Sequence, residues 1–138
     1  VKKYMKDALK EALPGLGFRR ILDEEGDNAS FLSITLPTLE QAERAVKAMS
    51  SEGIGGVFHY YNNNWHYIRR WFHLKERATL YRLPQEVLDR MPDYATVQFP
   101  QSDDIISRNL SIAINLSWSD EEVKSRTEAM IRALKSVF

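Results

Sequence analysis

The C-terminal part of the chain constrains the fold most, because a strand pattern is followed there directly by a helix pattern. The sequence NLSIAINL alternates apolar and polar residues with the strand period of two. The next segment, SDEEVKSRTEAMIRALKSVF, has the helical period, and Ser119 and Glu122 at its start have the spacing of a capping box. We therefore predict a strand over residues 109–116, followed by an amphipathic helix. The predicted inward positions are Leu110, Ile112, Ile114, Leu116, Val123, Met130, Leu134 and Val137.

The first half of the chain alternates between the same two patterns. Residues 1–13 predict a helix that the sequence PGLG ends, and residues 38–53 predict a second one, with Thr38 and Gln41 at capping-box spacing and Gly53 as its stop. Apolar runs at 18–23, 30–37 and 54–61 predict strands, the first two as a hairpin. The predicted inward positions of the two helices are Met5, Ala8, Leu9, Ala12, Leu13, Leu39, Ala42, Val46 and Met49. The fold class is thus α+β, a small antiparallel or mixed sheet covered by amphipathic helices.

Composition excludes several classes of function. The chain has 138 residues, the length of one domain, and its nineteen basic and nineteen acidic residues cancel. A neutral chain has no general field for a polyanion, so nucleic-acid and membrane-surface binding are disfavoured. The absence of cysteine excludes disulfides and thiolate chemistry and is typical of a reducing compartment, so we expect a cytoplasmic protein. Because the first residue is Val1, we expect a chain that is processed or cut from a longer one.

The stretch FHYYNNNWHYIRRWFH, residues 58–73, is the candidate functional segment. It opens an irregular excursion from about residue 61 to 98, and loops of this length in compact domains usually serve function or an interface. His59, His66 and His73 recur every seven residues, whereas helical zinc ligands are three or four apart, so hydrogen-bonded histidines are favoured over a metal site. Serine lacks a histidine partner in any catalytic motif. The carboxylate pairs 103–104 and 121–122 lie where helices begin, which capping explains.

Polar side chains in this stretch suggest two alternatives. Asn62, Asn63 and Asn64 can form a turn with left-handed residues, or they can offer amide groups to a hydroxyl-rich ligand stacked on Tyr60 or Trp65. The second alternative, together with arginine, suits a phosphorylated or carboxylated sugar. Arg69 and Arg108 are the candidate anion holders, although Arg108 can instead pair with Asp104 four residues earlier. The predicted substrate-binding set is His59, Tyr60, Asn62, Asn63, Asn64, Trp65, His66, Arg69 and Arg108.

Several segments resemble one family of enzymes. TLEQAERAVKAMSSEGIGGVFHYY and FPQSDDIISRNLSIAINLSWSDEEVKSRTEAMIRAL are similar to the small C-terminal domain of fold-type I, pyridoxal-phosphate-dependent sugar aminotransferases of the DegT/DnrJ type. GGVFHYYNNNWHYIRRW is most similar to the enzymes that aminate the 8-position of a keto-deoxyoctulosonate sugar acid in lipopolysaccharide biosynthesis. The sequence INLSW departs from the LPLH type of segment that the family has after the start of its fourth strand.

This resemblance implies a fragment that is inactive alone. Residues 1–13 would be a helix leading in from a missing large domain, and residues 14–138 the small domain. The large domain would hold pyridoxal phosphate, because none of the eight lysines matches the Schiff-base position: Lys2, Lys3, Lys6, Lys10, Lys47, Lys75, Lys124 and Lys135. The resemblance also implies glutamate as amino donor, a keto sugar or sugar acid as acceptor, and a homodimer.

A different class of protein also accommodates these residues. The chain can be a free-standing ligand- or protein-binding module that uses the aromatic loop 58–73. Trp65, Trp71 and Phe72 would then anchor an interface, since tryptophan, tyrosine and arginine concentrate at such sites.

Overall fold

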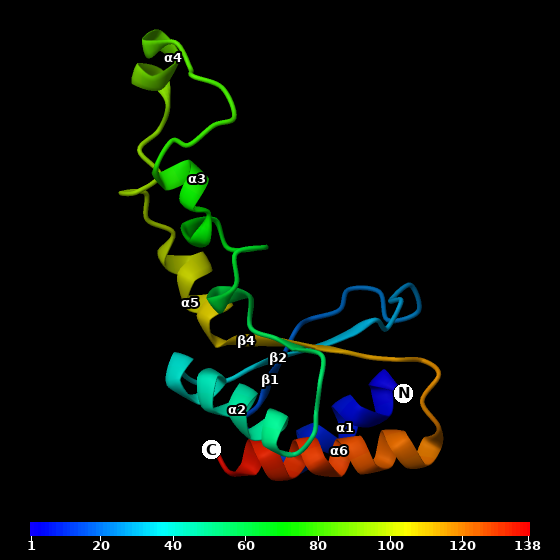
Figure 1. Cartoon of the computed structure of the whole chain (residues 1–138). Coiled ribbons are helices and arrows are strands. Elements are labelled where there is room, and N and C mark those ends of the chain that lie inside the picture. Colours follow the sequence, from blue (N-terminus) through cyan, green and yellow to red (C-terminus); the bar gives the residue numbers. More distant parts are fainter.

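The predicted α+β class is confirmed. The computed structural model describes all 138 residues. The main elements are α1 (Lys2–Ala12), β1 (Gly17–Phe18), β2 (Phe31–Thr35), α2 (Leu39–Ser51), β3 (Val57–Phe58), α5 (Pro100–Arg108), β4 (Asn109–Ala113) and α6 (Asp120–Lys135), as Figure 1 shows. Between β3 and α5 lie the short helices η1 (Tyr60–Asn62), η2 (Ile68–Arg70), α3 (Phe72–Lys75) and α4 (Gln85–Arg90).

The four strands form one antiparallel sheet in the order β1-β2-β4-β3. Strand β4 lies between β2 and β3, so these two run in the same direction and α2 crosses from one to the other. Leu32 is paired with Ile112 and Ile34 with Leu110, which puts the apolar residues of both central strands on the same face. The register therefore follows from the alternation in the sequence.

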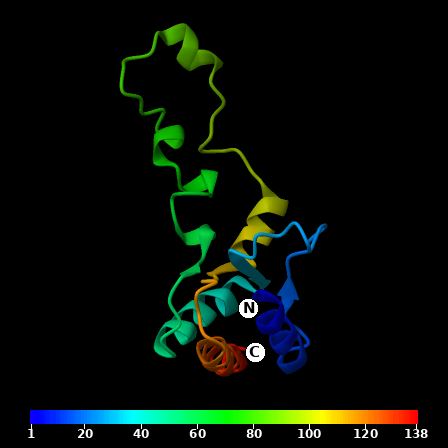
Figure 2. The ribbon, with the colours of Figure 1, turned by 90° about the vertical axis from the view of Figure 1, so that its right-hand side faces the viewer.

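The helices α1, α2 and α6 cover that face, and the core lies between them and the sheet (Figures 1 and 2). Leu9, Ile34, Met49 and Leu134 are 0% exposed, one from each of α1, β2, α2 and α6. At roughly 25 cal/mol per Å² of apolar surface, burying side chains of this size stabilises the fold by about 1.5–3 kcal/mol each. Residues 1–13 and 14–138, expected as two parts, thus share one core.

The helix caps follow local sequence rules only in part. Ser119 Oγ accepts from the amide of Glu122 at 3.2 Å, and the Glu122 carboxylate accepts from the Ser119 amide at 2.8 Å, so the predicted capping box of α6 is confirmed. At α2 only half of the box forms. The Thr38 hydroxyl accepts from the amide of Gln41, but the Gln41 side chain donates to the carbonyl of Val137 at 3.1 Å. A tertiary partner at the end of α6 replaces the local one.

All four predicted strands were too long, and the segment 30–37 forms a strand only over β2. The segment 18–23 keeps only Phe18 in β1, 54–61 forms only β3, and 109–116 ends as a strand at Ala113. Leu116 is 66% exposed and does not face the core as predicted. The backbone approaches β4 closely at Gly56, just before β3, where φ is +73° and a Cβ would lie 3.1 Å from Cβ of Ala113. That approach is allowed because glycine has no side chain there.

The predicted excursion is a projecting arm. We define the arm as residues 59–108, its stem as residues 59–70 together with α5, and its tip as residues 71–99. Figures 1 and 2 show the arm rising on the side of the sheet opposite α1, α2 and α6. The longest helices of the arm are α4 and α5. The sheet together with α1, α2 and α6 forms a packed unit, which we call the base. The arm touches the base only at the stem.

Candidate functional site

His59 lies at the root of the stem, where the chain leaves β3. Its ring is only 9% exposed, and Nε2 lies 2.8 Å from the carbonyl oxygen of Ser107 in α5. The other nitrogen, Nδ1, lies 3.1 Å from Nδ2 of Asn62. A neutral ring with its proton on Nε2 would satisfy both contacts, because Nε2 would donate to the carbonyl and Nδ1 would accept from the amide. His59 therefore joins the two legs of the stem.

The three asparagines have different surroundings. The Asn62 amide donates to Nδ1 of His59 and to the Glu43 carboxylate at 3.3 Å, while its oxygen accepts from the Arg70 guanidinium at 3.3 Å. Asn63 closes a local turn, since its side-chain oxygen accepts from the amide of Trp65 at 3.0 Å. Asn64 is exposed. Asn62 thus joins His59, Glu43 and Arg70 by hydrogen bonds, and Asn63 forms the turn expected of such a run. The side chain of Asn64 remains exposed to solvent.

A second connection between the legs was missed by sequence reasoning. Tyr67 is 6% exposed and its hydroxyl donates to the Asp103 carboxylate, whose other oxygen accepts from Arg69 at 3.2 Å. Arg69 also donates to Gln98 at 3.0 Å. Burial, followed by the hydrogen bond and charge of Asp103, raises the pKa of Tyr67 to about 12. No local signal could have paired residues that are 36 positions apart.

Arg108 lies at the junction of α5 and β4. Its guanidinium donates twice to Asp104, at 3.1 and 2.5 Å, and once to the carbonyl of Leu36 at 3.3 Å. This is the ion pair that the spacing of the two residues offered as an alternative to anion binding. The paired guanidinium holds the pKa of Asp104 below its usual range. A carboxylate that takes both Nε and Nη2 of Arg108 would have to displace Asp104.

Aromatic rings follow the stem from its root. The ring of Tyr60 lies between those of Phe58 and His66, with centroid distances of 6.0 and 4.2 Å, and Tyr61 stacks on Tyr67 at 5.1 Å. Such ring pairs contribute about 0.5–1.5 kcal/mol beyond the area they bury. These ring contacts stabilise the stem, which buries few side chains of its own.

Trp65 and Phe72 behave differently, because they are 67% and 62% exposed. A shallow hollow of about 320 Å³ lies where the stem meets the tip, and its lining includes both residues. The remaining lining residues are Asn64, Arg70, Trp71 and His73. Aromatic faces beside amide, imidazole and guanidinium groups can hold a polar ligand with a flat apolar side, and they can equally anchor a protein.

The three histidines do not meet. His59 is in the root of the stem, His66 packs against Tyr60, and His73 stacks on Trp71 at 5.9 Å. Nowhere in the chain do three or more histidine, aspartate or glutamate side chains lie close enough together to hold a metal ion. The histidines therefore have separate structural partners.

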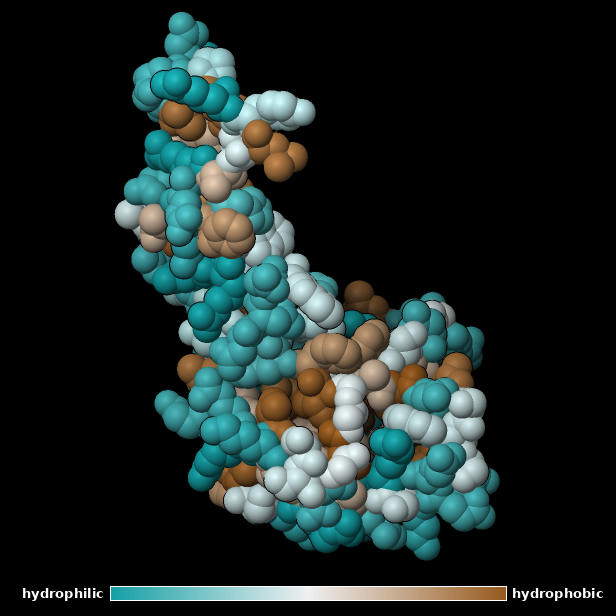
Figure 3. Space-filling view, viewed as in Figure 1, coloured by the Kyte–Doolittle hydropathy of each residue, from teal (hydrophilic) through white to brown (hydrophobic).

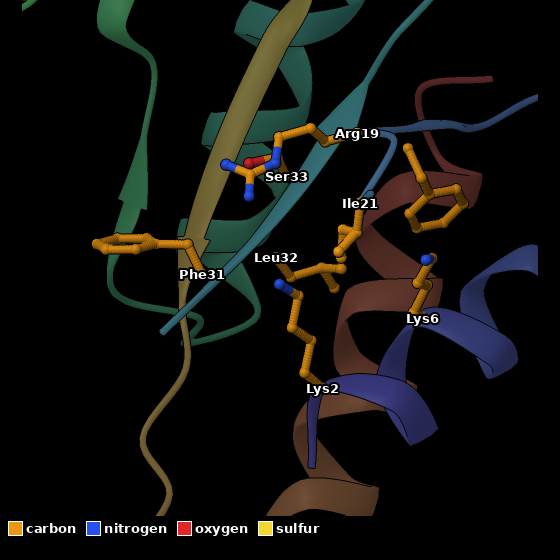
Figure 4. A pocket seen from close by; sticks show the side chains of 8 residues that line it. Lys2, Lys6, Arg19, Ile21, Phe31, Leu32 and Ser33 are labelled. Carbon is orange, nitrogen blue, oxygen red and sulfur yellow. The ribbon is translucent and has the colours of Figure 1, made fainter. Parts of the chain in front are cut away.

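The open face of the sheet and the arm bound one concave side of the molecule. Figure 3 shows apolar side chains gathered in the middle of the base, directly below the arm, and again near the end of the arm. On the open face, Ser33 and Ser111 lie side by side with their hydroxyls 3.4 Å apart, and Phe31 packs edge-on against Phe58 at 6.1 Å. Arg19 extends across Ser33 (Figure 4). Ser111 is nevertheless only 7% exposed, so neighbouring side chains cover part of this face.

A hollow between α1 and β2 is already occupied by charge pairs. Lys2 and Lys6 enter it from α1, as Figure 4 shows. Lys2 bonds Asp27 at 2.5 Å, with side chains only 10% and 16% exposed, and Lys6 lies 3.5 Å from Glu24. These pairs tie the loop before β2 to α1, so the lysines have a structural role.

The eight lysines also test the fit of a covalently held cofactor. All of them lie on helices, four on α1 and only Lys75 on the arm. The stem and the open sheet face, which bound the concave side, therefore contain no amine that could hold an aldehyde cofactor.

No family model matches the chain. None of its helices has the length and apolar character needed to cross a membrane.

Proposed function

We propose that the chain is the small C-terminal domain of a pyridoxal-phosphate-dependent sugar aminotransferase of the DegT/DnrJ type. In the parent enzyme, this domain forms one wall of a cleft in which an amino group passes from glutamate to a keto sugar or sugar acid. The cofactor, which supplies the electron sink for the transfer, is held by a large domain. In this proposal the parent is a cytoplasmic homodimer, most similar to the keto-deoxyoctulosonate 8-aminotransferases.

The observation that carries the proposal is the arm. Trp65, Phe72, Leu80 and Tyr81 are 67%, 62%, 98% and 83% exposed, although aromatic and leucine side chains gain about 1.5–3 kcal/mol each when fully buried. An arm of this length with so little packing of its own is suited to lie against a second body. The concave side between the arm and the open sheet face is where that body would complete a cleft.

The site residues have graded roles in this proposal. Tyr60, Asn64, Trp65 and His66 face outward or half-outward and can contact a sugar, because aromatic faces stack on its apolar side and an amide bonds its hydroxyls. His59, Asn62, Asn63 and Arg69 are engaged inside the stem and would position this wall. Arg108 would bind a carboxylate by exchanging it for Asp104.

Arg108 and Asp104 provide a matched pair of variants. If Arg108 binds a substrate carboxylate, Arg108→Ala raises the KM for glutamate or the sugar acid at least about tenfold, since a charged bidentate contact is worth roughly 1.5–3 kcal/mol. Asp104→Ala frees the guanidinium and leaves KM unchanged or lower. Equal effects of the two variants would mean that only their mutual ion pair matters, and would remove Arg108 from the site.

The coding region upstream of Val1 tests the whole proposal first. The reading frame should continue into a cofactor domain with a Schiff-base lysine. A start codon directly upstream, with no such domain, would refute it.

A second candidate is a free-standing binding module, and the exposed rings at the junction of stem and tip favour it as well. In that case the full-length chain would have no transamination activity. Trp65→Ala and Phe72→Ala would each weaken its binding to a protein or glycan ligand. Sedimentation of the purified protein separates the two: a domain lacking its covering body should self-associate through the arm, whereas an independent module should be a single defined species.

A further inference from the structure

The root of the arm contains a buried histidine in a network that tolerates only one protonation state. Nδ1 of His59 accepts from Asn62, and Nε2 donates to the carbonyl of Ser107. Imidazole is the side chain whose charge changes between about pH 5 and 8. Protonation would add a second donor at Nδ1, directly facing the donor group of Asn62.

The Asn62 amide cannot resolve this conflict by turning over. In its present orientation Nδ2 donates to both His59 and Glu43, and Oδ1 accepts from Arg70. A reversed amide would offer its oxygen to protonated His59. It would also place that oxygen against the Glu43 carboxylate and the NH₂ group against the Arg70 guanidinium, so restoring one hydrogen bond would break two others.

The hydrogen bonds of Asn62 that protonation would break tie η1 to α2 and to η2. Glu43 lies on α2, so its bond to Asn62 ties η1 to the packed helices, and Arg70 ties η2 to η1. The bond from His59 to Ser107 survives protonation, because Nε2 carries a proton in both states. The bonds of Tyr67 and Arg69 to Asp103 also remain. Protonation would thus release residues 60–70 from α2 without separating the two legs.

The other groups around His59 do not replace the bond to Asn62. Tyr61 stacks on the imidazole with a centroid distance of 5.9 Å, and the Arg70 guanidinium lies 5.4 Å from the ring centre of Tyr61. From α5, Asp104 and Arg108 are bonded to each other. Glu43 reaches His59 only through Asn62.

We infer that His59, Asn62, Glu43 and Arg70 form a pH-sensitive clamp that fixes residues 60–70 to α2 when His59 is neutral and releases them from α2 when His59 is protonated, while α5 stays bonded to the base through Arg108 and Leu36. The clamp concerns the attachment of residues 60–70 and does not depend on which partner the arm meets.

Hydrogen exchange of the full chain tests the clamp. Between pH 7.5 and 5.5, after correction for intrinsic exchange, amides in residues 60–70 should exchange faster by roughly two- to tenfold, the change expected for the loss of about one net hydrogen bond. Amides of β4 should not change. The midpoint should coincide with the titration of the His59 imidazole followed by nitrogen NMR, which should show the Nε2–H tautomer at high pH.

Variants assign the effect to this network. His66→Gln and His73→Gln should keep the response, because those rings lie outside the network. Asn62→Ala should make residues 60–70 exchange fast at both pH values. This variant removes only an exposed side chain and so avoids the folding risk of His59→Gln. A wild-type stem whose exchange is independent of pH, a response that persists in Asn62→Ala, or one that vanishes in His66→Gln would overturn the inference.

Discussion

Asp103 is the residue whose removal should loosen the stem most. It accepts from the Tyr67 hydroxyl and, at 3.2 Å, from Arg69, and both donors come from the opposite leg. In Asp103→Ala the hydroxyl of Tyr67, which is 6% exposed, loses its partner in a buried position. A buried unsatisfied polar group costs about 1–3 kcal/mol. The pair with Arg69, whose side chain is 34% exposed, adds at most about 1 kcal/mol because solvent screens it.

We therefore expect a loss of about 2 kcal/mol in the local stability of the stem. Amide exchange of residues 60–70 and 100–107 reports this loss directly, and it should exceed any change in the urea midpoint of the base, because the core lies elsewhere. Tyr67→Phe removes the hydroxyl together with its need for a partner, so it should cost only about 1 kcal/mol, and combining it with Asp103→Ala should be less than additive.

Asp104→Ala is the matched control for Asp103→Ala. It removes a neighbouring carboxylate of α5 whose side chain is 61% exposed and whose only bonded side chain is Arg108. Its effect on exchange in the stem should be small. Equal effects of the two variants would refute the reasoning that Asp103 joins the legs through Tyr67 and Arg69.

The same contact predicts a dependence on alkaline pH. The pKa of Tyr67 is raised to about 12 from an ordinary value of 10.0, so the neutral phenol is favoured in the folded stem. The corresponding stability is fully present below pH 10 and is lost as the pH rises from 10 through about 12. Exchange in the stem should accelerate over that range in the wild type, and Tyr67→Phe should lack this component. An identical alkaline profile in both proteins would contradict the assignment.

Three further variants test the base by urea unfolding. Gly56→Ala should destabilise the protein by about 1–2 kcal/mol, because φ is +73° and the new Cβ would press on Ala113, whereas Gly55→Ala, with open space around it, should not. Ser119→Ala should cost about 1 kcal/mol through loss of the capping box, and an unchanged midpoint would mean that α6 is held by packing alone. Leu134→Ala should cost about 2–5 kcal/mol because its side chain is fully buried, and a smaller loss would indicate that the core collapses onto the cavity.

The arm explains why the site was harder to predict than the fold. Its stem is stabilised by a few hydrogen bonds between side chains that are far apart in sequence, and its tip has no buried residue. The sequence pattern located the candidate segment by its composition. The pattern could not show that the Asn62 side chain would be hydrogen-bonded inside the stem and that of Asn64 exposed to solvent. This difference depends on where α2 places Glu43.

Local sequence alone determined the helices α1, α2 and α6, the capping box at Ser119, the left-handed stop at Gly53 and part of the inward faces. The predicted positions Ala8, Ala12, Leu39 and Val46 are only half-buried, whereas Ala45, which was not predicted, is buried. These features depend on neighbours within a few residues, so the chain specifies them wherever it folds. Only the tertiary structure decided that β4 lies between β2 and β3, that Gln41 reaches Val137, and that the stem closes through Ser107 and Asp103. Those interactions join residues many positions apart, and a polar group accepts whichever partner the packed core brings within hydrogen-bond distance.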